Sequence, residues 1–185
     1  MKLNIFALCC CALLALAGTS IHAAETESVH TGPVIEQFGP VYDVDSPGFV
    51  TPTNMTYRAV FDVALSPDAA DQLNPRIESL ARFLNMQARA GVKPEQVKLA
   101  LVVHGAASKD MLSNAAYKAR LGVDNPNAPL LAALQSKGVR VILCGQTAAH
   151  RGFSRQELAP GVEISLSAMT ALVALQSEGY ELISF

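Results

Sequence analysis

Five short segments of the chain consist mainly of apolar residues, and their lengths are typical of β-strands. They cover residues 57–65, 97–103, 139–143, 162–166 and 180–185. The second segment is apolar almost throughout, as is typical of a strand that is buried on both faces of a parallel sheet. Together the five segments predict a five-stranded sheet.

Apolar residues between these segments recur three or four positions apart, which predicts helices. One helix is expected over residues 73–88 and ends before Gly91, and a second helical stretch is expected near 108–120. Two more helices precede Gly138 and Gly179, where a left-handed glycine can turn the chain back to the sheet. Because strands alternate with helices, the sequence predicts an α/β fold in three layers (α/β/α) around a mainly parallel sheet.

The N-terminal part of the chain follows another pattern. Residues 1–24 combine a short basic start, an apolar run and small residues near Ala23, which is typical of a cleaved secretory signal peptide. The apolar run is shorter than the ~20 residues that a membrane-spanning helix needs, so we expect a periplasmic or secreted protein with no membrane attachment after cleavage. Residues 25–53 contain four prolines and three glycines and predict an extended arm. Residues 54–185 then form the α/β domain.

Composition limits the classes of partner. Half of the residues are apolar, which is enough for a sizeable core, and the formal charge is 14 − 16 = −2 with no run of like charge. Aromatic residues make up 6% of the chain and Trp is absent. The sequence therefore argues against nucleic-acid binding, which uses basic surfaces and aromatic stacking platforms.

The cysteines pose the sharpest chemical question. Three of the four, Cys9 to Cys11, lie in the expected signal peptide, so Cys144 alone would remain after export. A single thiol in an oxidising compartment is buried and inert, paired between chains, or reactive.

Two polar residues are expected where strands end. His104 follows the strand 97–103, and Cys144 follows the strand 139–143, directly before Gly145 and Gln146. Ligands of open α/β sheets gather at such carboxyl ends, and a thiolate is favoured near a helix N-terminus. The plain alternatives are a packed cysteine and a histidine satisfied by loop backbone.

Other kinds of site have no support in the sequence. A small-residue elbow around Cys144 is missing, so a Cys-His hydrolase is disfavoured. Zinc-ligand spacing, a G-x-G-x-x-G motif, a phosphate-binding P-loop and a C-x-x-C pair are also missing. We therefore expect neither a metal nor a cofactor.

Several stretches resemble the DsrE/DsrF-like family over about residues 56–185. They are Val102-Val103-His104-Gly105, Asn125-Pro126-Asn127, Val141 to Thr147, Leu158-Ala159-Pro160-Gly161-Val162 and Leu175 to Tyr180. The resemblance is greatest to the exported branch with a signal peptide and a Pro-rich arm. It implies an α/β/α domain that assembles into trimers or hexamers. In sulfur-relay members one Cys holds sulfane sulfur as a persulfide, and Cys144 matches that role; those members, however, are cytoplasmic.

Two functions remain open. The first is an exported sulfur carrier or sulfurtransferase in which Cys144 exchanges sulfur with a donor or acceptor protein. The candidate binding residues around it are His104, Gly105, Asn125, Asn127, Gly145 and Gln146. The second is a non-enzymatic, oligomeric protein of the same fold that binds a small anion in the same pocket. Whether the chain is an enzyme depends on whether Cys144 is reactive.

Overall fold

The computed structural model describes residues 29–184, so the expected signal peptide at 1–24 lies outside the described residues. Its main sheet has five strands in the order β6-β5-β4-β3-β7. All four pairings between neighbouring strands are parallel. The strands are β3 (Tyr57–Val63), β4 (Val97–Val103), β5 (Arg140–Cys144), β6 (Glu163–Ser165) and β7 (Glu181–Ser184). The predicted α/β fold with a five-stranded sheet is confirmed.

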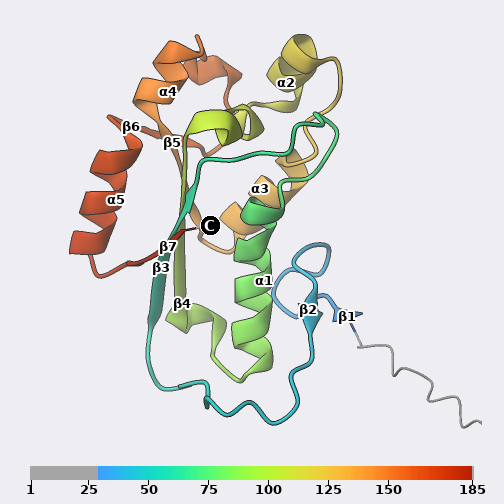
Figure 1. The fold of residues 1–185 in the computed structure, drawn as a ribbon, viewed down its shortest axis with the longest axis vertical. Coiled ribbons are helices and arrows are strands. Elements are labelled where there is room, and N and C mark those ends of the chain that lie inside the picture. Colours follow the sequence, from blue (N-terminus) through green and yellow to red (C-terminus); the bar gives the residue numbers. More distant parts are fainter. Residues whose placement is uncertain (1–28, 185) are drawn as a thin grey trace, which may run out of the picture.

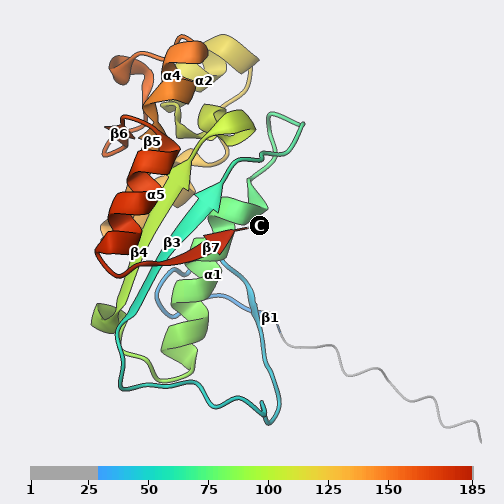
Figure 2. The same cartoon turned by 60° about the vertical axis from the view of Figure 1, so that its left-hand side comes forward.

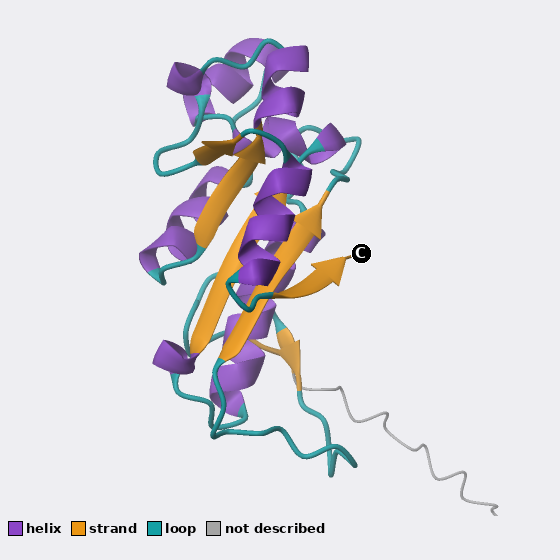
Figure 3. Cartoon of the chain, turned by 90° about the vertical axis from the view of Figure 1, so that its left-hand side faces the viewer, coloured by secondary structure: helices purple, strands orange, loops and turns teal. Residues whose placement is uncertain are grey.

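Helices cover both faces of the sheet. On one face, α1 (Pro75–Arg89) contacts β3 and β4, while α3 (Ala128–Ser136) contacts β5. On the other face, α5 (Ala168–Ser177) lies across β3, β4 and β5 (Figures 1 and 2). Figure 3 shows the resulting layers, with helices in front of and behind the strands. This is the predicted three-layer arrangement.

Side chains alternate between the two faces of each strand, so apolar residues are buried on both faces of the sheet and form two hydrophobic cores. The larger core, on the α1 side, includes Leu99, Leu101, Val103 and Leu143. The smaller core lies under α5. It consists of Val60, Ala100, Val102, Ile142, Cys144, Ala168, Ala171 and Leu175.

The chain beyond Val103 differs from the predicted helix near 108–120. Residues Gly105–Met111 form a 3-10 helix, and α2 begins only at Asn114 and ends at Leu121. A separate helix begins at Asn114 because the hydroxyl of Ser113 caps it by accepting from the backbone N–H of Ala116. The short α4 (Gly145–His150) follows β5 directly, and 3-10 helices also occupy Pro94–Gln96 and Arg155–Glu157.

The N-terminal arm packs along α1 and has one small element of structure. Strands β1 (Val29–His30) and β2 (Val41–Tyr42) pair antiparallel, which the proline and glycine density did not predict. The fully buried side chain of Asn85 holds the segment between them. Its Oδ1 accepts from the backbone N–H groups of Val34 and Ile35. Its Nδ2 donates to the carbonyl oxygens of Ile35, Phe38 and Gly39.

None of the helices within residues 29–184 is long and apolar enough to cross a lipid bilayer.

Candidate functional site

Cys144 is the last residue of β5 and the N-cap of α4, as the strand and turn pattern predicted. It is also the only free cysteine among residues 29–184, and 5% of its surface is exposed. Its neighbours in the small core include Val102, Ile142 and Ala171. The thiol therefore lies at the carboxyl edge of the sheet, beneath the first turn of α5.

The Cys144 sulfur sits among hydrogen-bond donors from two helices. Burial raises the pKa of the thiol, but hydrogen bonds from the Thr147 hydroxyl and from the backbone N–H groups of Thr147, Ala168 and Gln146 outweigh it. Thr147 and Gln146 belong to α4, and Ala168 is the first residue of α5. The pKa of Cys144 consequently lies below its ordinary value, so the site favours the thiolate over the thiol.

Gly145 and Gln146 have identifiable roles beside the sulfur. A Cβ at Gly145 would lie 2.3 Å from the carbonyl oxygen of Ser165, so only glycine lets β5 turn into α4 against the end of β6. The side-chain amide nitrogen of Gln146, Nε2, donates to the carbonyl oxygen of Leu166 at 3.2 Å. Gly145 thus packs closely against the segment that leads into α5, Gln146 binds that segment, and the backbone N–H of Gln146 faces the thiol.

His104 lies beside Cys144 in the sheet. Val103 pairs with Leu143 in the parallel register, so the next residues, His104 and Cys144, occupy neighbouring positions on adjacent strands. Adjacent strands are about 4.8 Å apart. The backbone of His104 is still extended and donates its N–H to the carbonyl oxygen of Val63, which continues the ladder. The structure therefore brings together the two edge residues that the sequence singled out.

Asp62, which the sequence pattern did not single out, contacts His104. Oδ1 of Asp62 lies 3.0 Å from Nε2 of His104, and both side chains are partly buried. Alternation along β3 places Asp62 on the same face as Val60, which belongs to the small core with Cys144. An acidic residue between the buried apolar residues Phe61 and Val63 was the signal that could have found it. Asp62, His104 and Cys144 thus lie on three successive strands, on one face of the sheet.

Gly105 supports the loop after His104. Its φ is 56°, in the left-handed region, and a Cβ would lie 2.9 Å from the carbonyl oxygen of Ala64. Glycine is required here for the chain to leave β4 close to the end of β3. The structure gives Gly105 a role in the backbone, and its predicted binding role stays a prediction.

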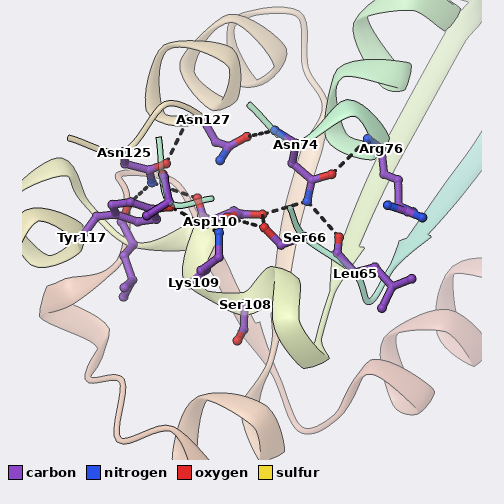
Figure 4. Close-up of polar contacts among 12 residues, drawn as sticks. Leu65, Ser66, Asn74, Arg76, Ser108, Lys109, Asp110, Tyr117, Asn125 and Asn127 are labelled. Carbon is purple, nitrogen blue, oxygen red and sulfur yellow. Dashed lines mark hydrogen bonds and ion pairs between the residues drawn. The ribbon is translucent and has the colours of Figure 1, made fainter. Parts of the chain in front are cut away.

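Asn125 and Asn127 belong to a separate buried cluster, shown in Figure 4. Asn125 donates to the carbonyl oxygens of Asp110 and Leu112, and Asn127 accepts from the backbone N–H of Asn74. These side chains fasten the 3-10 helix and the start of α1 to the segment before α3. The structure does not bring them to Cys144, and a role in ligand binding stays a prediction.

Asp110 is the charged centre of that cluster and is fully buried. Its carboxylate accepts from the hydroxyl of Ser66, from Nδ2 of Asn74 and from Nζ of Lys109 (Figure 4). Both carboxylate oxygens of Asp110 are therefore hydrogen-bonded, which offsets the cost of burying the charge.

A groove of about 290 Å³ opens on the α5 side, next to the candidate site. Ile142, Ser165, Leu166 and Thr170 contribute to its wall. Ser165 is paired with Cys144 in the sheet, so the groove begins one residue away from the thiol. In the described part of the chain, three or more His, Cys, Asp or Glu side chains do not gather in a way that suits a metal ion.

Comparisons with known proteins agree with the fold. The model of the DsrE/DsrF-like family matches residues 58–185. A protein of unknown function from Methanobacterium thermoautotrophicum is similar in structure, with a TM-score of 0.52 and 21% identity over 70% of this chain and 99% of the other. The ychN protein of E. coli gives a TM-score of 0.50 and 22% identity over 69% and 99% of the two chains. At these identities the two structures show the fold alone. No curated protein matches the chain.

Proposed function

The chain belongs to the DsrE/DsrF-like family, and we propose that it is an exported sulfur carrier that holds sulfane sulfur as a persulfide on Cys144. The single observation that carries the proposal is the set of donors around the Cys144 sulfur. Donors from α4 and from the first residue of α5 converge on this atom and lower its pKa despite burial. A structural cysteine needs no such set, whereas a nucleophilic thiolate or a persulfide anion does.

The proposed step is a sulfur transfer in which the Cys144 thiolate attacks the sulfane sulfur of a donor such as thiosulfate. A bond forms between Sγ and the sulfane sulfur, and the bond between the sulfane and sulfonate sulfurs breaks. Sulfite leaves with the electron pair of the broken bond, and Cys144 carries the persulfide anion. When the thiol is the starting form, its proton passes to His104, which Asp62 orients.

Intact-mass spectrometry tests the proposal directly. Incubation with thiosulfate or polysulfide should add about 32 Da, one sulfur atom, and a reductant should remove it. Cys144→Ser should not take up sulfur and should keep the fold, because the replacement is nearly isosteric. Ser165→Ala is the matched control, because it changes a residue paired with Cys144 but leaves the thiol. An unmodified mass in the native protein under these conditions would contradict the proposal.

The alternative is a non-enzymatic protein that binds a small anion with Cys144 as part of the wall. The low exposure of Cys144, 5%, is the observation that favours it. Maleimide distinguishes the two functions. A carrier should be labelled at Cys144 while folded, whereas a wall residue should be labelled only after unfolding.

The proposal includes export and self-assembly. Export depends on the signal peptide expected at residues 1–24, and N-terminal sequencing of secreted protein should find a start at Ala24 or Glu25. Assembly into a trimer or hexamer of identical chains is supported by apolar side chains on the outer surface of α5 and just before it. Leu166, Met169 and Val173 are 72%, 75% and 65% exposed, and their spacing puts the last two on one side of the helix.

A further inference from the structure

A second pocket lies beyond the carboxyl end of α4, away from the thiol at its beginning. Its volume is about 230 Å³, and three cationic and three apolar side chains line it: Lys109, Arg120, Arg151, Leu112, Leu121 and Phe153. These residues come from the 3-10 helix after β4 and the residue that follows it, from the end of α2 and from the segment after α4. The fold therefore gathers three positively charged residues from three different elements.

Arg120 is held in place on the pocket wall. Its Nε donates to Oε1 of Glu157 at 2.9 Å, and its Nη2 donates to the carbonyl oxygen of Gly152 at 2.8 Å. Its guanidinium carbon lies 4.8 Å from the ring centroid of Phe153, within the range of a cation–π contact. Neither Glu157 nor Gly152 engages Nη1, so the fixed guanidinium has a donor to offer a ligand.

Lys109 is held in the same way. Its Nζ lies 2.8 Å from Oδ1 of Asp110 and 5.5 Å from the ring centroid of Tyr117. Burial lowers the pKa of Lys109, but Asp110 and Tyr117 outweigh burial and hold the pKa above its ordinary value. Lys109 is therefore cationic at neutral pH, and because its Nζ already donates to Asp110 and to the Tyr117 hydroxyl, one ammonium hydrogen remains for a ligand.

Arg151 gives the pocket its excess of charge. It is exposed, and within residues 29–184 it forms no ion pair. Two of the three cations, Lys109 and Arg120, are paired with the carboxylates of Asp110 and Glu157. One positive charge, that of Arg151, is left over. Asp110 is fully buried and already hydrogen-bonded to Ser66 and Asn74, so it does not occupy the pocket.

We propose that this pocket binds a small organic anion, with a carboxylate or sulfonate group at the cations and an apolar body against Leu112, Leu121 and Phe153. An inorganic oxyanion would leave the apolar walls without a partner, and a neutral molecule would leave the excess charge unmatched. The site does not involve Cys144, and its occupation is independent of the persulfide function.

Nuclear magnetic resonance titration of the folded protein tests the proposal, with benzoate and benzenesulfonate as probes. Both should bind with dissociation constants of about a millimolar, as expected for ligands of this size, and should shift the signals of Leu121 and Phe153. Benzyl alcohol and sodium sulfate are the comparison probes, since the first lacks the charge and the second lacks the apolar body. Each should bind at least about ten-fold more weakly than the aromatic anions.

Three variants complete the experiment. Arg151→Ala should weaken binding of the aromatic anions about ten-fold, because a charge-assisted contact is lost. Arg155→Ala, which removes an exposed arginine outside the pocket, should leave binding unchanged. Leu121→Trp should fill the pocket and abolish binding without altering any charge. Equal binding of benzyl alcohol, tighter binding of sulfate, or equal effects of Arg151→Ala and Arg155→Ala would each overturn the proposal.

Discussion

Nε2 of His104 lies 3.0 Å from Oδ1 of Asp62, and this contact links the ends of two strands beside Cys144. A carboxylate in this position fixes the orientation of the imidazole ring. Nε2 is the nitrogen that contacts Asp62, and Nδ1 is outside this contact. Asp62 is thus a positioning residue for His104 in the proposed sulfur transfer.

Asp62→Asn should slow the sulfur loading of Cys144 about ten-fold, which is less than the loss of a complete general base costs. His104→Ala should slow loading by at least as much. Because the two residues act as a unit, the double variant should be no slower than His104→Ala alone. The rate is followed by intact mass, and Asp62→Glu should restore part of it. Additive losses in the double variant would show that Asp62 acts independently of His104.

The hydroxyl of Thr147 is predicted to control the acidity of the thiol. Burial raises the pKa of Cys144, and the hydrogen bonds that lower it include the one from this hydroxyl. Thr147→Val should raise the pKa and slow alkylation by iodoacetamide at pH 7 about three-fold, since one hydrogen bond is lost. Thr170→Val is the control, because that hydroxyl is hydrogen-bonded to Ser167, the N-cap of α5. The pH dependence of the alkylation rate gives both measurements, and identical profiles for the two variants would refute the assignment.

Glu157 is predicted to make the fold sensitive to acid. The backbone N–H of Ser154, the Arg120 guanidinium and the Ser154 hydroxyl lower the pKa of Glu157 from 4.5 to about 2. A carboxylate whose pKa is lower in the folded than in the unfolded state stabilises the fold above the unfolded value. Its contribution should be complete above about pH 4.5 and should be lost as the pH falls towards 2. Glu157→Gln should therefore be less stable than the wild type at pH 7, and the difference should shrink in acid. Urea unfolding at several pH values measures it, and a difference that does not change with pH would contradict the prediction.

Asn85 is predicted to hold the N-terminal arm on α1. Its side chain makes hydrogen bonds to the backbone of Val34, Ile35, Phe38 and Gly39. Asn85→Ala should lower the free energy of unfolding by about 2–3 kcal/mol, because several buried backbone groups lose their partner. Hydrogen exchange should rise in residues 34–39 before it rises in the sheet. Lys137→Ala, at an exposed position at the end of α3, provides the control and should change neither quantity much.

The exposed apolar surface of α5 is predicted to mediate self-assembly. Met169→Glu combined with Val173→Glu should reduce the mass measured by light scattering from that of a trimer or hexamer to that of a monomer, because a charge would be buried without a partner. Val44→Glu changes an equally exposed apolar residue of the arm and should leave the mass unchanged. A monomeric wild-type protein at micromolar concentration would contradict the prediction.

The strands were predictable from the sequence, because apolar runs such as Val97–Val103 and the glycines after the helices carry local information. Cys144, His104 and Gly145 were identified in the same way, since residues at strand ends reach the sheet edge whatever the strand order. The contacts of Asp62 with His104 and of Asn85 with the arm were not predictable. They join residues 42 and up to 51 positions apart, and only the strand order and the packing of α1 decide them. The break at Ser113 was missed for another reason, because a 3-10 turn followed by a capped helix has nearly the same apolar spacing as one longer helix.

The hydrogen bonds of Asn85 to the arm also affect when the arm can reach its native position during synthesis of the chain. Residues 34–39 leave the ribosome before residue 85, whose side chain holds them. Until α1 has formed, the arm has no surface on which to settle, and Ile35 and Val41, both buried in the finished fold, remain in contact with solvent. This part of the arm is therefore made before the helix on which it packs, and during that interval it is open to chaperones and proteases.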